Sequence, residues 1–102
     1  MSEPDVPTPE VYQAELDPPT LARLFEDLAT HAEVLEVRAK HAERAMTGEG
    51  TIDLDEARAL LETRAVRGVQ VRYRHEGELW LDTLMVGPTY VRLVRTRVPE
   101  PP

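Results

Sequence analysis

Four arginines and the only tryptophan of this sequence recur at alternate positions in its last third. They are Arg72, Arg74, Trp80, Arg95 and Arg97. Steps of two residues place side chains on one face of a β-strand. A guanidinium binds carboxylates and phosphates through paired hydrogen bonds, and it stacks on an indole ring. Together, these five side chains would suit an acidic peptide, another anionic ligand or a stacked base.

These residues need a sheet to hold them on one face. The segment from Val66 to Val98 is the long stretch with period-two alternation and punctuating glycines, which predicts a three-stranded antiparallel meander. We place its first turn at His75-Glu76-Gly77, with Gly77 at the third loop position, where glycine adopts a positive φ without strain. The second turn contains Gly87 and Pro88, which are typical turn residues.

The length of the first turn decides which side chains share a face. A three-residue loop pairs Arg72 with Trp80, and the second turn then brings Arg95 and Arg97 to the same side. One face would carry Val69, Val71, Tyr73, Leu79, Leu81 and Thr83, and the other Gln70, Arg72, Arg74, Glu78, Trp80 and Asp82. The sheet would therefore have one apolar face and one face of arginines around an indole.

A two-residue loop at Glu76-Gly77 is the alternative. It would set Asp82 opposite Val71 and His75 opposite Glu78, which mixes polar and apolar side chains on each face. We therefore favour the three-residue loop.

Two helices are predicted before the meander. Asp17 followed by Pro18 is a typical helix start. The first apolar stripe consists of Leu21, Leu24, Phe25 and Leu28, at helical spacing. Asp53, with Glu56 three residues later, resembles a capping box and predicts the start of the second helix. Its stripe consists of Ala57, Leu60, Leu61 and Arg64.

The segment from Ala32 to Ala45 fits two periods. Its Ala, Glu, Arg and Lys content favours a continuing helix, whereas Leu35, Val37 and Ala39 alternate with charged residues as in a strand. We prefer the helix, with a break near His31. A loop is expected at residues 46–50, because two glycines lie there.

The expected architecture is α+β and two-layered. A three- to four-stranded antiparallel sheet, formed by the C-terminal β-meander, carries two N-terminal helical segments on one face. Residues 17–98 form the single domain. Residues 1–16 are acidic and proline-rich and are expected to be a disordered tail, and residues 99–102 are expected to fray.

The charge is unevenly distributed along the chain. The formal net charge is −7, with five basic and fifteen acidic residues in 1–63 against seven arginines and three acidic residues in 64–98. A domain this acidic would be repelled by a phosphate backbone unless its basic face were well focused. General binding of nucleic acid is therefore not expected.

Composition also bears on cellular location. The chain has no cysteine, which excludes disulfides and thiolate chemistry and suits a reducing cytoplasm. No apolar run approaches the roughly 20 residues that a membrane span needs. The acidic N-terminus does not resemble a secretory signal.

No residue pattern indicates a metal site, a cofactor or catalysis. The three histidines, His31, His41 and His75, have no ligand spacing that we can assign. Asp53 and its acidic neighbours are explained by helix capping. We therefore expect no enzyme activity, no metal and no cofactor.

The sequence thus predicts a small interaction or accessory protein. It would bind a larger, acidic protein partner through the arginine and tryptophan face. The alternative is a single-stranded nucleic-acid-binding module that uses the same face. A simpler interpretation is that Glu78 and Asp82 neutralise part of the arginines and the rest is an ordinary solvated strand face. In another, the acidic helices of the same chain or of a second copy lie over this face. Two copies could also pair through the last predicted strand, from Tyr90 to Val98, as an exposed edge.

Overall fold

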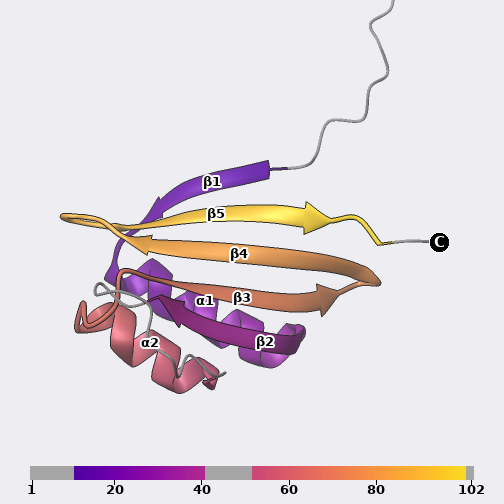
Figure 1. The fold of residues 1–102 in the computed structure, drawn as a ribbon, viewed down its shortest axis with the longest axis horizontal. Helices are drawn as coiled ribbons and strands as arrows, with labels where there is room; N and C mark the ends of the chain where they lie inside the picture. Colours follow the sequence, from indigo (N-terminus) through magenta and orange to yellow (C-terminus); the bar gives the residue numbers. More distant parts are fainter. Residues whose placement is uncertain (1–10, 41–51, 101–102) are drawn as a thin grey trace, which may run out of the picture.

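The computed structural model describes residues 11–40 and 52–100 and shows an α+β fold (Figure 1). Its elements are β1 (Val11–Leu16), α1 (Pro18–His31), β2 (Glu33–Lys40), α2 (Leu54–Glu62), β3 (Gly68–His75), β4 (Glu78–Val86) and β5 (Val91–Val98). The strands form one antiparallel sheet in the order β1-β5-β4-β3-β2. The predicted fold class is confirmed, but the described sheet has five strands and not three or four.

Both helices begin at the predicted caps. The Asp17 carboxylate accepts a hydrogen bond from the Thr20 amide at 3.0 Å, and the Asp53 carboxylate accepts one from the Glu56 amide at 2.8 Å. Each bond satisfies an amide that has no partner inside the first helical turn. α1 ends at His31, where Ala32 takes up an extended backbone conformation.

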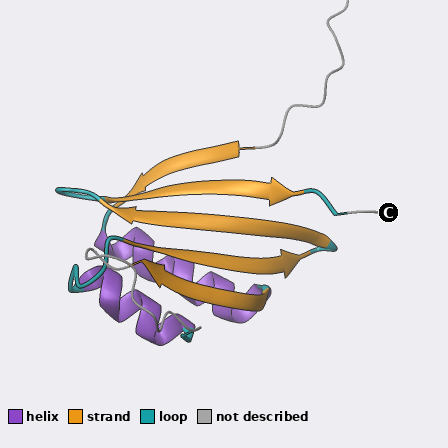
Figure 2. Ribbon diagram, in the orientation of Figure 1, coloured by secondary structure: helices purple, strands orange, loops and turns teal. Residues whose placement is uncertain are grey.

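The core lies between the helices and one face of the sheet (Figure 2). α1 buries Leu21, Phe25 and Leu28, and α2 buries Ala57 and Leu61. On the sheet, the buried apolar side chains are Leu16, Val37, Val69, Val71, Tyr73, Leu84, Val91 and Leu93. These buried residues alternate along β3 and β5. The side chains between them therefore point away from the helices.

The segment that we expected to continue as a helix is a strand. β2 pairs with β3 along its length, and Val37 lies opposite Val71 in the core. Helix propensity is a weak prior, and pairing with a neighbouring strand outweighs it here. The predicted loop at residues 46–50 lies outside the described residues.

The sheet also extends past the predicted meander at its other edge. Residues 11–16, which we assigned to the tail, form β1 and pair with β5 from Val11↔Thr96 to Leu16↔Val91. β5 therefore has a neighbour on each side, and the predicted exposed edge from Tyr90 to Val98 is wrong. In the described sheet, the edge strands are β1 and β2.

The first turn of the meander has two residues and not three. His75 pairs with Glu78, and Glu76 and Gly77 have φ angles of 53° and 80°. Positive φ at both central residues is the mark of a type I′ turn, whose twist matches that of a hairpin. The predicted register is therefore wrong by one position, and every side chain of β4 changes face relative to β3.

Candidate functional site

The register divides the five predicted site residues between two faces. Tyr73, a core residue of β3, pairs with Trp80, and Trp80 pairs with Arg97. Trp80, Arg95 and Arg97 therefore belong to the face that carries the helices. Arg72 and Arg74 alternate with the buried residues of β3 and point to the other side. The prediction that all five share one face is wrong.

The two arginines on the outer face are paired within the chain. The Arg72 guanidinium lies 2.9 Å from the Glu36 carboxylate, and that of Arg74 lies 2.8 Å from the carboxylate of Glu100. The bonds from Arg38 and Arg72 hold the pKa of Glu36 below its usual value. Two leucines lie on this outer face as well, because Leu81 pairs with Arg72 and Leu79 pairs with Arg74. We had assigned both leucines to the core face.

On the helix face, the sheet is only partly covered. In Figure 1, α1 and α2 lie under the part of the sheet around β2 and β3, and the opposite half with β1 and β5 extends beyond them. A hollow of about 310 Å³ lies in this uncovered region, lined by Val11, Tyr12, Trp80 and Arg95. We call it the Trp80 hollow. It unites two of the predicted site residues with two residues of β1.

Behind the hollow, Arg95 is fixed by a buried carboxylate. The Asp82 side chain is 0% exposed. Arg95 donates to both Asp82 oxygens, each at 2.8 Å, and the Tyr73 hydroxyl donates to Asp82 Oδ1 at 3.0 Å. This two-point contact is the strong geometry for an arginine and a carboxylate. The Arg95 guanidinium also lies 5.9 Å from the centre of the Tyr73 ring, which favours its charge further.

The same contacts fix the protonation states of Tyr73 and Arg95. Burial raises the pKa of Tyr73, and the negative charge of Asp82 raises it further, so the hydroxyl stays protonated and donates. The hydrogen bond to Asp82 raises the pKa of Arg95. Arg95 therefore remains a cation in a defined orientation.

Arg95 keeps donors that face outward. A guanidinium has five N–H groups, and the bonds to Asp82 come from Nε and from one Nη2 hydrogen. Its side chain is 29% exposed and lines the Trp80 hollow as well as the smaller hollow beside His31 and His75. The hollow thus combines two aromatic rings with an oriented cation. Arg97 lies beside Trp80 and bonds to Glu78 at 3.2 Å.

The histidines form no comparable site in the described residues. A small hollow of about 160 Å³ includes Asp27, His31, His75 and Arg95. A ring nitrogen of His75 lies 3.1 Å from the His31 carbonyl oxygen. Within residues 11–40 and 52–100, no group of three His, Asp or Glu side chains could hold a metal ion. His41 lies outside these ranges.

A larger hollow of about 600 Å³ lies among α1, β2 and the start of α2. Its lining is apolar and acidic, and it includes Leu35, Asp53 and Asp55. Asp53 is already used as the helix cap. The larger space therefore offers less chemistry than the Trp80 hollow.

Sequence reasoning missed three members of the site. The sequence places Tyr12 in the tail and Tyr73 in the core alone. It places Asp82 on a solvated face, as a general counter-charge to the arginines. One signal was available, because a charged residue inside the apolar alternation of β4 needs a partner if that face is buried.

Comparison with family models, curated proteins and solved structures finds no match for this chain. Neither described helix has the length and apolar character needed to cross a membrane. Fold and site together define a small α+β domain with an open sheet surface that carries an aromatic hollow and an oriented arginine.

Proposed function

We propose that this protein is a non-enzymatic interaction module, which binds an acidic segment of a larger protein partner through the Trp80 hollow and Arg97. The observation that carries the proposal is the joint lining of one hollow by Tyr12, Trp80 and Arg95. Tryptophan, tyrosine and arginine are the residues most enriched among those that dominate the energy of protein interfaces.

The orientation of Arg95 supports an anionic ligand. Asp82 holds the guanidinium in place, so little side-chain entropy is lost when the free N–H groups bind a carboxylate. Arg97 would add a second guanidinium at the rim of the hollow, where its partner within the chain is the exposed Glu78 carboxylate at 3.2 Å. Such rim charges contribute mainly to the association rate and to specificity.

The role of Asp82 supports binding without catalysis. Its carboxylate accepts three hydrogen bonds from Tyr73 and Arg95 and is closed to solvent. A carboxylate in this state positions a neighbour and is not available to take a proton from a ligand. The cysteine-free composition suits interaction in a reducing cytoplasm.

The chain contains its own reporter for a binding experiment. Trp80 is the only tryptophan, so tryptophan fluorescence, excited selectively over the three tyrosines, reports on the hollow. We expect a glutamate-rich synthetic peptide to change this fluorescence in a saturable way. Arg97→Ala should weaken binding about threefold to tenfold, because a rim charge is lost. Tyr12→Ala should weaken it by about tenfold or more.

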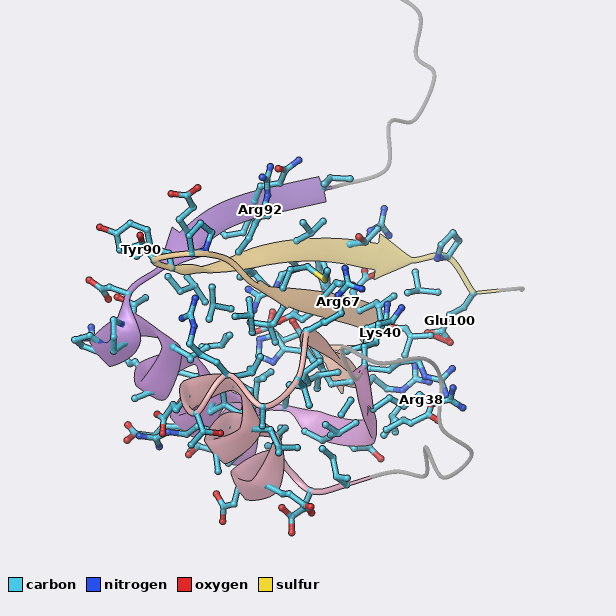
Figure 3. All side chains as sticks on the ribbon, turned by 60° about the vertical axis from the view of Figure 1, so that its left-hand side comes forward. Arg38, Lys40, Arg67, Tyr90, Arg92 and Glu100 are labelled. Atoms are coloured by element: carbon cyan, nitrogen blue, oxygen red, sulfur yellow. The ribbon has the colours of Figure 1, made fainter. Side chains whose placement is uncertain are left out.

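Matched controls exist elsewhere on the molecule. Arg92 lies on the same strand as Arg97 but points to the other face, where it donates to Gln13 at 2.8 Å. Tyr90 is an exposed tyrosine at the opposite end of β5 from Glu100, as the labels in Figure 3 show. Arg92→Ala and Tyr90→Ala should leave peptide affinity unchanged. Equal losses in these controls, or no peptide binding, would contradict the proposal.

The arrangement of Tyr12 and Trp80 also favours a second candidate function, the binding of single-stranded nucleic acid. Two aromatic rings beside a guanidinium can also stack the bases of a single-stranded nucleic acid. An oligo(dT) titration decides between the two functions. Tight binding of oligo(dT) that weakens steeply with salt, without binding of the acidic peptide, would favour the nucleic-acid-binding module.

A further inference from the structure

The two edges of the sheet differ in how well they are protected. On β2 the register shifts between Val34 and Glu36, which is a β-bulge, and the Ile52 amide donates to the Val37 carbonyl at 3.1 Å. Bulges and covering segments are common devices that prevent a sheet edge from pairing. β2 is therefore a guarded edge.

β1 has none of these devices. Its six residues pair with β5 without a register shift, and no proline interrupts them. Among the described residues, no segment lies along its outer side, because β1 ends the strand order. Val11 and Tyr12 are 52% and 57% exposed, so this short strand carries two large apolar side chains in the solvent. An edge of this kind is a template for another strand.

We propose that β1 pairs antiparallel with β1 of a second copy, about a two-fold axis at Gln13. The two sheets then join into one, and the helices of both copies lie on the same side. Directly opposed residues share a face in an antiparallel pair, so Tyr12 of each copy meets Ala14 of the other. Likewise, Val11 meets Glu15.

The side chains of β1 favour a second copy as the occupant. On the helix face, a large ring meets a small methyl group twice. On the outer face, Val11 packs on the aliphatic part of Glu15. The two amides of Gln13 meet at the axis, where each Nε2 can donate to the other's Oε1, which keeps one lone pair beside its bond from Arg92. No like charges are opposed. The strand is therefore complementary to itself.

Other registers that keep the faces matched are less favourable. An axis at Glu15 would oppose two carboxylates of the same sign. An axis at Ala14 would set Tyr12 opposite Leu16, but Leu16 is only 6% exposed and already packs in the core. The chain also turns into α1 directly after it, at Pro18. The axis at Gln13 uses the exposed part of the strand.

The first test is a pair of charge substitutions at Val11. Val11→Lys places a cation opposite Glu15 twice and should tighten the dimer, whereas Val11→Glu opposes like charges twice and should weaken it. We expect the two dissociation constants, measured by sedimentation, to differ by about tenfold. Tyr90→Lys and Tyr90→Glu make the same changes in net charge beside the end of β1, where Leu16 pairs with Val91, but not opposite Glu15 of the second copy. Their dissociation constants should differ much less.

The second test uses the absence of native cysteine. Opposed Cα atoms in an antiparallel pair lie about 4.5–5.5 Å apart. This separation is within the range that a disulfide spans. Gln13→Cys should therefore form a disulfide-linked dimer under mild oxidation. Glu15→Cys, whose opposed residue is Val11, should crosslink much less. Circular dichroism confirms that each variant is folded.

Three results would support the pairing of β1 strands, and two would overturn it. Concentration-dependent dimerisation, opposite effects of the two Val11 variants and selective crosslinking of Gln13→Cys would support the pairing. A native chain that stays monomeric at millimolar concentration would overturn it. A dimer that responds equally to the Val11 and Tyr90 substitutions would also overturn it. Peptide binding by the Trp80 hollow is measured separately and does not decide this question.

Discussion

Asp82 is the residue on which the site depends. It lies in the central strand of the sheet, opposite Val71 and Arg95, and is completely buried. A buried carboxylate is tolerated only when it is paired and hydrogen-bonded. Tyr73 and Arg95 meet this requirement from the two neighbouring strands. The same contacts that make the fold tolerate Asp82 also orient the cation of the Trp80 hollow.

This pairing predicts a large loss of stability in Arg95→Met. Methionine keeps the aliphatic bulk but leaves the Asp82 charge buried with one donor, so unfolding should become easier by about 3–5 kcal/mol. Urea denaturation at pH 7 measures the change. Arg92→Met, on the same strand but facing the other way, should stay within about 0.5 kcal/mol. Similar values for the two variants would contradict the role of the ion pair.

Asp82 also shows why the site was predicted only in part. The alternation along β4 and β5 correctly predicted that Trp80, Arg95 and Arg97 lie on one face. This part was predictable because alternation is a local property of each strand. A carboxylate inside the apolar pattern of β4 seemed to rule out the two-residue turn. Its partners come from two different strands, and such contacts cannot be derived from alternation along one strand.

Among the elements, the β3–β4 turn has the widest consequences. Glu76 and Gly77 adopt positive φ, and the resulting register assigns Leu79 and Leu81 to the outer face and Trp80 to the helix face. Glycine tolerates this conformation, but glutamate does so at a cost. The backbone conformation at Glu76 therefore lowers the stability of the turn.

Glu76→Asn should stabilise the hairpin. Asparagine is favoured at the first central position of a type I′ turn, and we expect a gain of about 0.5–1 kcal/mol, or about 2–8 °C in the melting temperature. Thermal unfolding followed by circular dichroism measures it. Glu76→Ala removes the same charge without the conformational preference and should gain little. If both variants gain equally, charge and not backbone geometry limits the native turn.

The helices were predictable, whereas β1 was not, and the strand β2 was only the less favoured of two alternatives for its segment. Caps at Asp17 and Asp53 and the apolar stripes are local signals, and both helices begin where these signals place them. β1 and β2 depend on partners that are far away in the sequence. Glu15 and Arg92, for example, are paired residues from opposite ends of the chain. Such pairing outweighs composition, which had favoured a tail and a helix.

The net charge of −7 affects both proposed interactions. The sequence predicts that four of the seven arginines in residues 64–98 form a basic face with Trp80. The ion pairs of Arg72, Arg74 and Arg95 neutralise much of this charge inside the chain. A second copy therefore approaches a surface that is acidic overall. An acidic peptide instead approaches the N–H groups of Arg95 that Asp82 does not use.

Salt should therefore act on the two interactions in opposite directions. Raising the ionic strength from about 0.1 M to 1 M shortens the screening length from about 10 Å to about 3 Å. Repulsion between two copies of charge −7 is then screened, and the dimer formed through β1 should become several-fold tighter. Attraction between Arg95, Arg97 and a glutamate-rich peptide is screened as well, so peptide affinity should fall several-fold. Sedimentation and Trp80 fluorescence measure the two effects under matched conditions. If both interactions weakened with salt, self-association would depend on charge pairs and not on the β1 edge.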